Sequence, residues 1–219
     1  VGMPPILYAK SPIRYIIELD AEGRLLNPEP TDNSDPSKPR TRRGVVRLVP
    51  RVQRTSALRP LLLSDNSEYS LGLPRESSRT ERCQACHQAY MEQLEACAKQ
   101  TREPSVAAVL RFLQGHPLAA LRLPKDFDAG ANVTFRVDGT FPVDLQPVQD
   151  FWAERNALDT EGQDAAPVMP CVVCGRERPA LRRLQGKIKG IPGGQPSGTA
   201  IISANADAFY SYGLRESLI

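Results

Sequence analysis

Proline is the feature that most limits the folds open to this chain, because it has twenty prolines in 219 residues. Their share is nearly twice the usual value of about 5%. Proline breaks helices and is excluded from central strands, so we expect many short elements joined by stiff turns. Residues 82–99 contain neither proline nor glycine, and here the sequence predicts a long helix.

The other predicted elements give an α+β fold, with mixed strands at both ends of the chain and a helical insertion in the middle. Residues 20–23 (DAEG) form a turn signal between two strand-like segments and predict a hairpin. Pro50 places the strand around it at a sheet edge. Residues 27–39 are predicted to be a mobile loop and residues 159–170 a flexible linker. The predicted strands are 13–19, 24–26, 44–52, 133–137 and 199–203, and the other predicted helices are 105–114 and 148–156.

Positive charge is concentrated in two runs, although the net charge is only +3. Residues 38–59 hold eight basic and no acidic side chains, and residues 176–189 hold six basic side chains against Glu177. Arginine dominates both runs, and its planar guanidinium suits phosphate. Two such runs are typical either of solvated surfaces or of a protein with a polyanionic partner.

Enzymatic chemistry finds little support in the sequence. The two histidines, His87 and His116, have ordinary structural explanations, and neither a G-x-S-x-G nor an H-E-x-x-H motif occurs. Lys187 follows a glycine as in a phosphate-binding loop, but Ile188 replaces the Ser or Thr that binds Mg²⁺. A nuclease would need a carboxylate cluster, for which Asp126 and Asp128 are the nearest pair. We therefore expect no enzyme activity.

Four of the five cysteines form two C-x-x-C pairs, a spacing that can hold a tetrahedral zinc ion. The pairs are Cys83 with Cys86 and Cys171 with Cys174. However, Cys83, Cys86, Tyr90 and Cys97 also share one face of the predicted helix, as core residues would. The sequence leaves both readings open: zinc is possible, and no cofactor is required.

A glycine-rich loop, GIPGGQPSG at residues 190–198, precedes the last predicted strand. Glycine lets main-chain N–H groups approach a phosphate or enter a minor groove. Gln195 can read a base edge, and Lys187 and Lys189 can neutralise phosphates. Gly193, Gly194, Gln195 and Ser197 are therefore predicted to contact nucleic acid.

The same region resembles a known family. Residues 186–213 (GKIKGIPGGQPSGTAIISANADAFYSYG) resemble the signature of the large subunit of the type I-C CRISPR surveillance complex, also called Cascade. Residues 171–175 match the family's C-x-V-x-G knuckle. Further upstream, Pro50, Arg54 and the Asp65-Asn66 pair fit a second family motif. The resemblance extends over nearly the whole chain, although the family often has Thr where Cys174 stands.

The resemblance implies a non-catalytic role in antiviral defence. The chain would be the N-terminal domain, residues 1–219, of a longer large subunit whose C-terminal helical bundle is absent. Such a domain recognises the protospacer-adjacent motif in double-stranded target DNA and helps to open the duplex for guide-RNA pairing. Its expected partners are target DNA, guide RNA, the other subunits of the complex and a helicase-nuclease that the complex recruits. We expect a cytoplasmic location and no membrane contact, since no apolar run approaches the ~20 residues that span a bilayer.

Asn66, Asn205, Arg51 and Arg54 complete the predicted DNA contacts. Asn at such positions also caps helices or closes turns, so a purely structural role competes with base or phosphate contact. The alternative function is a zinc-stabilised module that docks guide RNA or partner subunits without reading DNA sequence.

Overall fold

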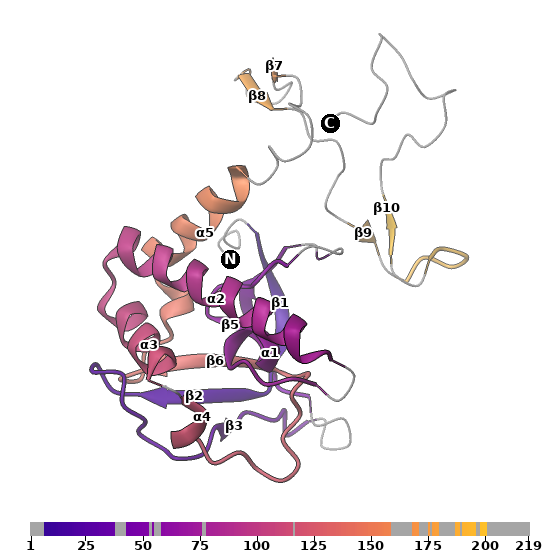
Figure 1. Ribbon diagram of the computed structural model, residues 1–219. Coiled ribbons are helices and arrows are strands. Elements are labelled where there is room, and N and C mark those ends of the chain that lie inside the picture. Colours follow the sequence, from indigo (N-terminus) through magenta and orange to yellow (C-terminus); the bar gives the residue numbers. More distant parts are fainter. Residues whose placement is uncertain are drawn as a thin grey trace. The chain divides into compact units, whose positions relative to one another are not determined.

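The computed structural model divides into two compact units, unit 1 (Val1–Asn156) and unit 2 (Ala157–Ile219). Figure 1 follows the chain from its indigo N-terminal part to its yellow C-terminal part. The structure describes residues 7–37, 43–52, 54, 58–75, 78–115, 117–158, 168–170, 175, 177–179, 187–188, 190–195 and 198–200.

A four-stranded sheet with strand order β3-β2-β6-β5 is the framework of unit 1. Its central strands β2 and β6 run parallel, from Tyr15 opposite Val133 to Leu19 opposite Val137. The outer strands pair antiparallel, β3 with β2 and β5 with β6. All of β2 is buried, as expected of a parallel strand that is covered on both faces. The strands are β2 (Tyr15–Leu19), β3 (Thr31–Asp32), β5 (Ser64–Asn66) and β6 (Asn132–Val137).

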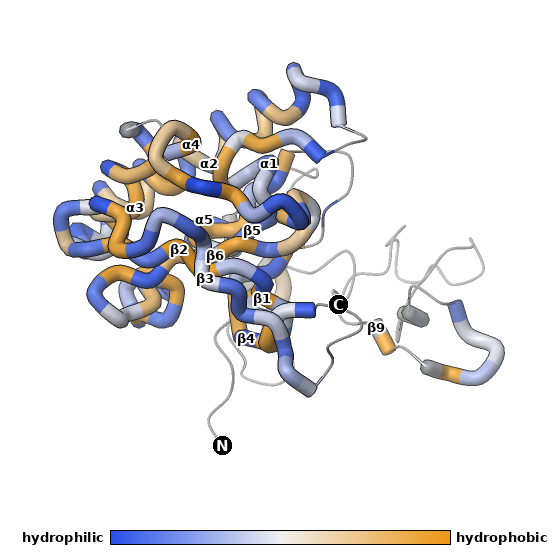
Figure 2. The backbone as a smooth tube through the Cα atoms, turned by 90° about the horizontal axis from the view of Figure 1, so that it is seen from below, coloured by the Kyte–Doolittle hydropathy of each residue, from blue (hydrophilic) through white to orange (hydrophobic). Residues whose placement is uncertain are grey.

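A two-stranded ribbon joins this sheet. Strand β1 (Tyr8–Ile13) pairs antiparallel with β4 (Val45–Pro50), and only Arg14 separates β1 from β2. The Arg14 main-chain N–H donates to the carbonyl of Asn132 at 3.0 Å, so the chain passes directly from the ribbon into the sheet. The predicted edge strand around Pro50 is confirmed. Figure 2 shows hydrophobic colouring along parts of β1 and β4.

The helices fall mainly between β5 and β6, which confirms the predicted α+β arrangement. Helix α2 ends where Arg102 adopts a left-handed conformation, φ 55°. Helix α3 has Pro104 in its first turn and Gly115 after its last residue, as predicted. Helices α2 and α3 pack on each other, and α3 packs on β6 (Figure 1). The helices are α1 (Ser67–Ser70), α2 (Thr80–Thr101), α3 (Pro104–Gln114), α4 (Pro117–Ala120), the 3₁₀ helix η1 (Pro142–Asp144) and α5 (Gln146–Leu158).

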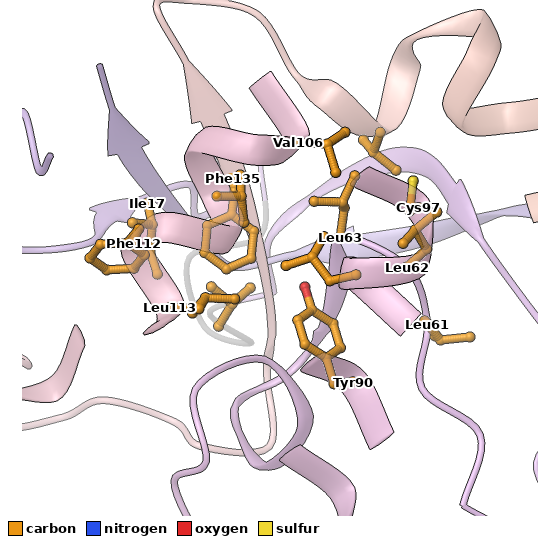
Figure 3. Packing of buried hydrophobic residues seen from close by; sticks show 14 of the residues in the cluster. Ile17, Leu61, Leu62, Leu63, Tyr90, Cys97, Val106, Phe112, Leu113 and Phe135 are labelled. Atoms are coloured by element: carbon orange, nitrogen blue, oxygen red, sulfur yellow. The ribbon is translucent and has the colours of Figure 1, made fainter. Parts of the chain in front are cut away.

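The core lies between these helices and the sheet (Figure 3). Phe112 of α3 meets Phe135 of β6 edge to face, with ring centroids 6.4 Å apart. Trp152 of α5 is fully buried, and its indole N–H donates to the carbonyl of Leu7 at 3.0 Å. The predicted core stripe of α2 is confirmed, because all four of its residues are buried: Cys83, Cys86, Tyr90 and Cys97.

Unit 2 contains two short antiparallel pairs, β7 with β8 and β9 with β10. The predicted C-terminal strand is confirmed for Thr199 and Ala200, and residues 201–203 lie outside the described part. No described helix of either unit is both long enough and apolar enough to cross a membrane. The strands are β7 (Val168–Pro170), β8 (Glu177–Pro179), β9 (Lys187–Ile188) and β10 (Thr199–Ala200).

The predicted hairpin after β2 is confirmed, whereas the mobile loop predicted after it is partly wrong. Leu19 bridges Leu25 in antiparallel fashion. Within the supposed loop, however, β3 adds to the sheet beside β2, and Asp32 accepts a hydrogen bond from Arg14 at 2.9 Å. A two-residue strand is too short to show alternation, and its partner is distant in sequence. Local composition therefore could not reveal it.

Gly44, at the start of β4, tests the junction between ribbon and sheet. A β-carbon at this position would overlap the main-chain carbonyl of Ile13. We expect Gly44→Ala to lower the free energy of unfolding by about 1–3 kcal/mol, because the backbone must shift to admit a methyl group. Urea denaturation measures this change.

Gly115→Ala is the matched control. Gly115 has φ −82°, and the atom nearest to where its β-carbon would stand is 3.4 Å away, so its stability should change by no more than about 0.5 kcal/mol. Equal effects of the two substitutions would contradict the close approach at Gly44.

Candidate nucleic-acid interface

The glycine loop closes the hairpin formed by β9 and β10. Thr199 pairs with Ile188 and Ala200 pairs with Lys187. Two turns follow one another in the loop: the Gly194 N–H donates to the Ile191 carbonyl, and the Gly198 N–H donates to the Gln195 carbonyl, both at 2.9 Å. We call residues 187–200 the glycine hairpin.

The structure explains each glycine of the hairpin in local terms. Gly190, Gly193 and Gly198 have φ of 80°, 76° and 103°, where other residues are strained. Gly194 has ordinary φ, but a β-carbon there would lie 2.6 Å from the Thr199 hydroxyl oxygen. The glycines therefore shape the turns, and this accounts for their number without any ligand.

The hairpin nevertheless exposes two of the residues predicted to meet DNA. Gly193 and Gln195 are exposed, and no described atom lies within 4 Å of a β-carbon position on Gly193. The main chain at Gly193 is therefore open to close approach. Ile191, beside it, is 43% exposed. The backbone of Lys187 forms β9, whereas Lys189, Ser197 and Asn205 lie outside the described residues.

In unit 1, Asn66 ends β5 and caps α1. Its side-chain Oδ1 accepts the N–H of Glu68 at 3.1 Å. The structural role anticipated for this Asn is therefore present. Within the described residues no group accepts from its Nδ2 amide, so the half-exposed side chain still presents a donor.

Asp65, next to Asn66, organises the turn that precedes β5. Its side chain is fully buried and accepts the N–H groups of Leu61 and Asn66, both at 2.8 Å. Arg54 donates one hydrogen bond to the Asp65 carboxylate and a second one to the main-chain carbonyl of Arg59, the latter at 2.8 Å. Burial raises the pKa of the Asp65 carboxyl, while Arg54 and the two N–H donors oppose this shift.

Arg54 is thus committed to the fold. Its guanidinium also lies over the ring of Tyr69, 4.3 Å from the ring centroid. Arg47, in the same basic run, forms an ion pair with Asp144 at 2.5 Å. Sequence reasoning assigned both arginines to solvated or phosphate-binding surface, because their acidic partners lie 11 and 97 residues away.

Arg51 differs from these two arginines because its side chain is exposed. Its main-chain N–H donates to the carbonyl of Leu7 at 2.7 Å, which fixes its place at the end of the β1–β4 ribbon. Arg43, at the other end of β4, is also exposed. Among the described arginines of the first basic run, the exposed ones are therefore Arg43 and Arg51, which lie near the two ends of one strand.

The cysteines of α2 are core residues. Cys83 and Cys86 are each 2% exposed, and burial raises the pKa of the Cys83 thiol. Cys171 and Cys174 lie outside the described residues. No group of three His, Cys, Asp or Glu side chains that could hold a metal ion occurs in the described part of the chain. The four-cysteine zinc site stays a prediction.

Of the residues considered for enzymatic roles, His87 and Asp128 make contacts within the fold. His87 Nδ1 lies 2.8 Å from the main-chain oxygen of Tyr69. Asp128 accepts the N–H of Gly130 at 2.8 Å, which closes a turn. His116 lies outside the described residues.

These observations define an α+β protein with an exposed glycine hairpin and with a partly exposed residue, Asn66, that caps α1. Comparison with known families gives the assignment: the family described as CRISPR-associated protein (Cas_Csd1) matches residues 1–218, and the chain belongs to it. The resemblance seen in the sequence motifs, to the large subunit of the type I-C CRISPR surveillance complex, is thereby confirmed. A search of curated proteins found no match.

Removing Arg54 tests the buried ion pair. Arg54→Met would leave the Asp65 carboxylate buried without its cation. We expect the free energy of unfolding at neutral pH to fall by about 2–4 kcal/mol, less than for a fully buried pair because Arg54 is partly exposed. Urea denaturation at neutral and mildly acidic pH measures it.

The Asp65 carboxyl determines how the loss of stability in Arg54→Met changes with pH. Without Arg54 the folded-state pKa of Asp65 rises further above its unfolded value, so the deficit against the parent protein shrinks as pH falls toward the raised pKa. Arg51→Met removes an exposed arginine nearby and should change stability by no more than about 0.5 kcal/mol. A deficit that is absent, or that grows on acidification, would contradict the assignment.

Proposed function

We propose that this chain is the DNA-binding domain of its surveillance complex that recognises the protospacer-adjacent motif in double-stranded DNA and helps to open the duplex for the guide RNA. The observation that carries the proposal is the tip of the glycine hairpin. There Gly193 has open space where a side chain would stand, and Gln195 is exposed beside it.

This tip has the chemistry needed to read a groove. A main chain without a side chain can approach base edges closely, as proteins do in the minor groove. The carboxamide of Gln195 carries both a donor and an acceptor, and can pair with a base edge or wedge between base pairs. Reading by so few groups gives about 1–3 kcal/mol of discrimination per good contact, so the remaining affinity must come from phosphate contacts and from the complex.

The proposed phosphate contacts are Arg51 in unit 1 and Lys187, Lys189 and Ser197 in unit 2, with the Asn66 amide as a donor to base or phosphate and Asn205 as a further candidate. Arginine and lysine at phosphates release counterions, so binding should weaken steeply with salt. Arg54 supports the position of Asn66 within unit 1, since its side chain holds the turn before Asn66 through Asp65.

The domain would act without catalysis. Within the proposal it opens and holds the duplex in the cytoplasm, guide RNA reads the target strand, and a recruited helicase-nuclease cuts. The Cas_Csd1 family, a structural subunit of the complex, supports this division of labour. The position of His87 against a main-chain oxygen also supports a structural role for that side chain.

A zinc-stabilised docking module is the second candidate. The feature that favours it is Gly175, which directly follows Cys174 between β7 and β8 and has φ +68°. A glycine in this conformation after C-x-x-C suits the tight turn of a zinc knuckle. Cys83 and Cys86, by contrast, are accounted for as core.

Motif reading is tested by closing the open space at the hairpin tip. Asn tolerates positive φ, so Gly193→Asn should keep the hairpin while placing a side chain where the groove must approach. We expect the parent chain to prefer a duplex carrying the cognate three-base motif by at least about fivefold over one with an altered motif. Gly193→Asn and Gln195→Ala should each abolish this preference, as measured by fluorescence anisotropy over a salt series.

Gly139→Asn is the matched control, because Gly139 has φ 80° and equally open space but lies after β6. It should leave the preference intact. Arg51→Ala should weaken binding to all duplexes alike and reduce the salt slope by about one unit. Equal binding of the parent chain to every duplex, together with stoichiometric zinc by mass spectrometry, would refute motif reading by this chain and favour the docking module.

A further inference from the structure

The outward edge of β4 is an unpartnered strand edge. The Arg51 N–H donates to the Leu7 carbonyl of the neighbouring strand. Because antiparallel pairs alternate, Val49 and Arg47 also direct their main-chain groups toward β1, and Val46 and Leu48 direct theirs away from it. The position of Pro50 agrees with this alternation, because it falls in the outward set, where its missing N–H costs no ladder hydrogen bond.

No described strand covers this edge. Strand β4 has β1 as its only neighbour in the described sheets. At the beginning of β4, the Val45 N–H, which by the same alternation points to the β1 side, donates to the carbonyl of Asn33 at 2.9 Å, and Gly44 bridges Ser34. Beyond that point, no main-chain partner of Val46 or Leu48 occurs on the outward side within the described residues. Within the described part of the chain, the main chain of Val46 and Leu48 is therefore unpaired on this side.

The side chains along the edge are apolar, and those at its start are accessible, whereas Leu48 is half-buried against the core and Pro50 is buried. Val46 is 50% exposed and Val45 is 40% exposed. Val46 stands opposite Pro12 and Leu48 opposite Lys10, so these four residues share one face of the ribbon. Figure 2 shows the hydrophobic colouring of this part of β4. Exposed apolar edge strands invite pairing with another chain, and proteins normally shield them.

We propose that this edge binds an extended strand of a partner protein, with apolar residues at its centre and acidic residues at its two ends. A protein strand supplies the alternating N–H and C=O groups that Val46 and Leu48 require, whereas a nucleic-acid backbone offers acceptors only. The apolar face of Val46 and Leu48 likewise matches side chains rather than phosphates.

The charges at the two ends of β4 indicate which residues the partner strand should carry at its own ends. Arg43 and Arg51 are exposed at the two ends of β4, eight residues apart, which is about 26 Å along a strand. Arg47, between them, is occupied by Asp144 and lies 3.7 Å from the ring centroid of Phe141. The centre of the edge is therefore apolar and its ends are basic, which complements acidic residues about eight positions apart.

This surface shares Arg51 with the proposed phosphate contacts, but it involves neither the glycine hairpin nor Asn66, which carry the proposed motif reading. The probe is a fluorescein-labelled nine-residue peptide, Glu-Glu-Val-Thr-Val-Thr-Val-Glu-Glu, and its control replaces every Glu by Lys. We expect the acidic peptide to bind the 219-residue chain at low salt about tenfold more tightly than the basic one, with the difference shrinking as salt is added.

Amide exchange by nuclear magnetic resonance locates the binding. In the free chain the amides of Arg47 and Val49 should exchange slowly and those of Val46 and Leu48 quickly. The acidic peptide should slow Val46 and Leu48 selectively. Protection that appears elsewhere, with these two amides unchanged, would overturn the proposal.

Two substitutions at one position give the matched test. Val46→Pro removes an outward N–H, as Pro50 already does, and should weaken peptide binding about tenfold. Val46→Thr keeps the N–H and should weaken it by no more than about threefold. Thermal unfolding of Val46→Pro checks that the ribbon is intact.

Three results would refute an acidic partner strand. One is equal binding of both peptides, and another is slowed exchange of the Val46 and Leu48 amides by a short DNA duplex instead of by the acidic peptide. The third is concentration-dependent dimerisation of the chain that Val46→Pro abolishes, which would make a second copy the occupant. Loss of DNA motif preference leaves all of these readouts unchanged, so the two proposals fail separately.

Discussion

The parallel pairing of β2 with β6 is the constraint on which unit 1 depends. It joins segments 118 residues apart, and Glu18 of β2 and Arg136 of β6 form an ion pair directly across it. Two parallel strands side by side require a crossover. Here the crossover carries the hairpin after β2, strands β3 to β5 and helices α1 to α4. This crossover places α1 and α3 against the sheet, while α2 packs on both of them and α4 packs on α3.

Within the crossover, several charged side chains form ion pairs with one another and are therefore not free to bind a partner. The segment from Ser64 to Ser70 is polar yet mostly buried, and it is viable because Asp65 and Glu68 each have an arginine partner, Arg54 and Arg75. Buried carboxylates without such partners would be strongly destabilising. Of the arginines described in the first basic run, Arg47 and Arg54 are therefore held by carboxylates, whereas Arg43 and Arg51, near the two ends of β4, are exposed.

Local patterns predicted the local structure well. The hairpin after β2, the cysteine stripe of α2, the proline start and glycine end of α3 and strand β6 all follow from the residue pattern inside one element or one turn. Strand β3 and the ion pairs of Arg47 and Arg54 did not, because their partners are set by chain reversals that composition does not encode. The glycine loop stays a predicted contact surface, and its number of glycines reflects turn geometry. Asp65 gave one usable signal, a carboxylate between two apolar stretches, which indicates burial.

In the glycine hairpin, the same residue is required by the turn and is proposed to contact DNA. Positive φ at Gly193 requires glycine for the turn, and the same lack of a side chain leaves the main chain open. The most direct measurement is site-specific photocrosslinking from Pro192, exposed at the tip, in the assembled surveillance complex with target duplex DNA. Our account predicts crosslinks to the base pairs of the protospacer-adjacent motif. Crosslinks confined to protein subunits, or spread along the DNA without regard to the motif, would contradict it.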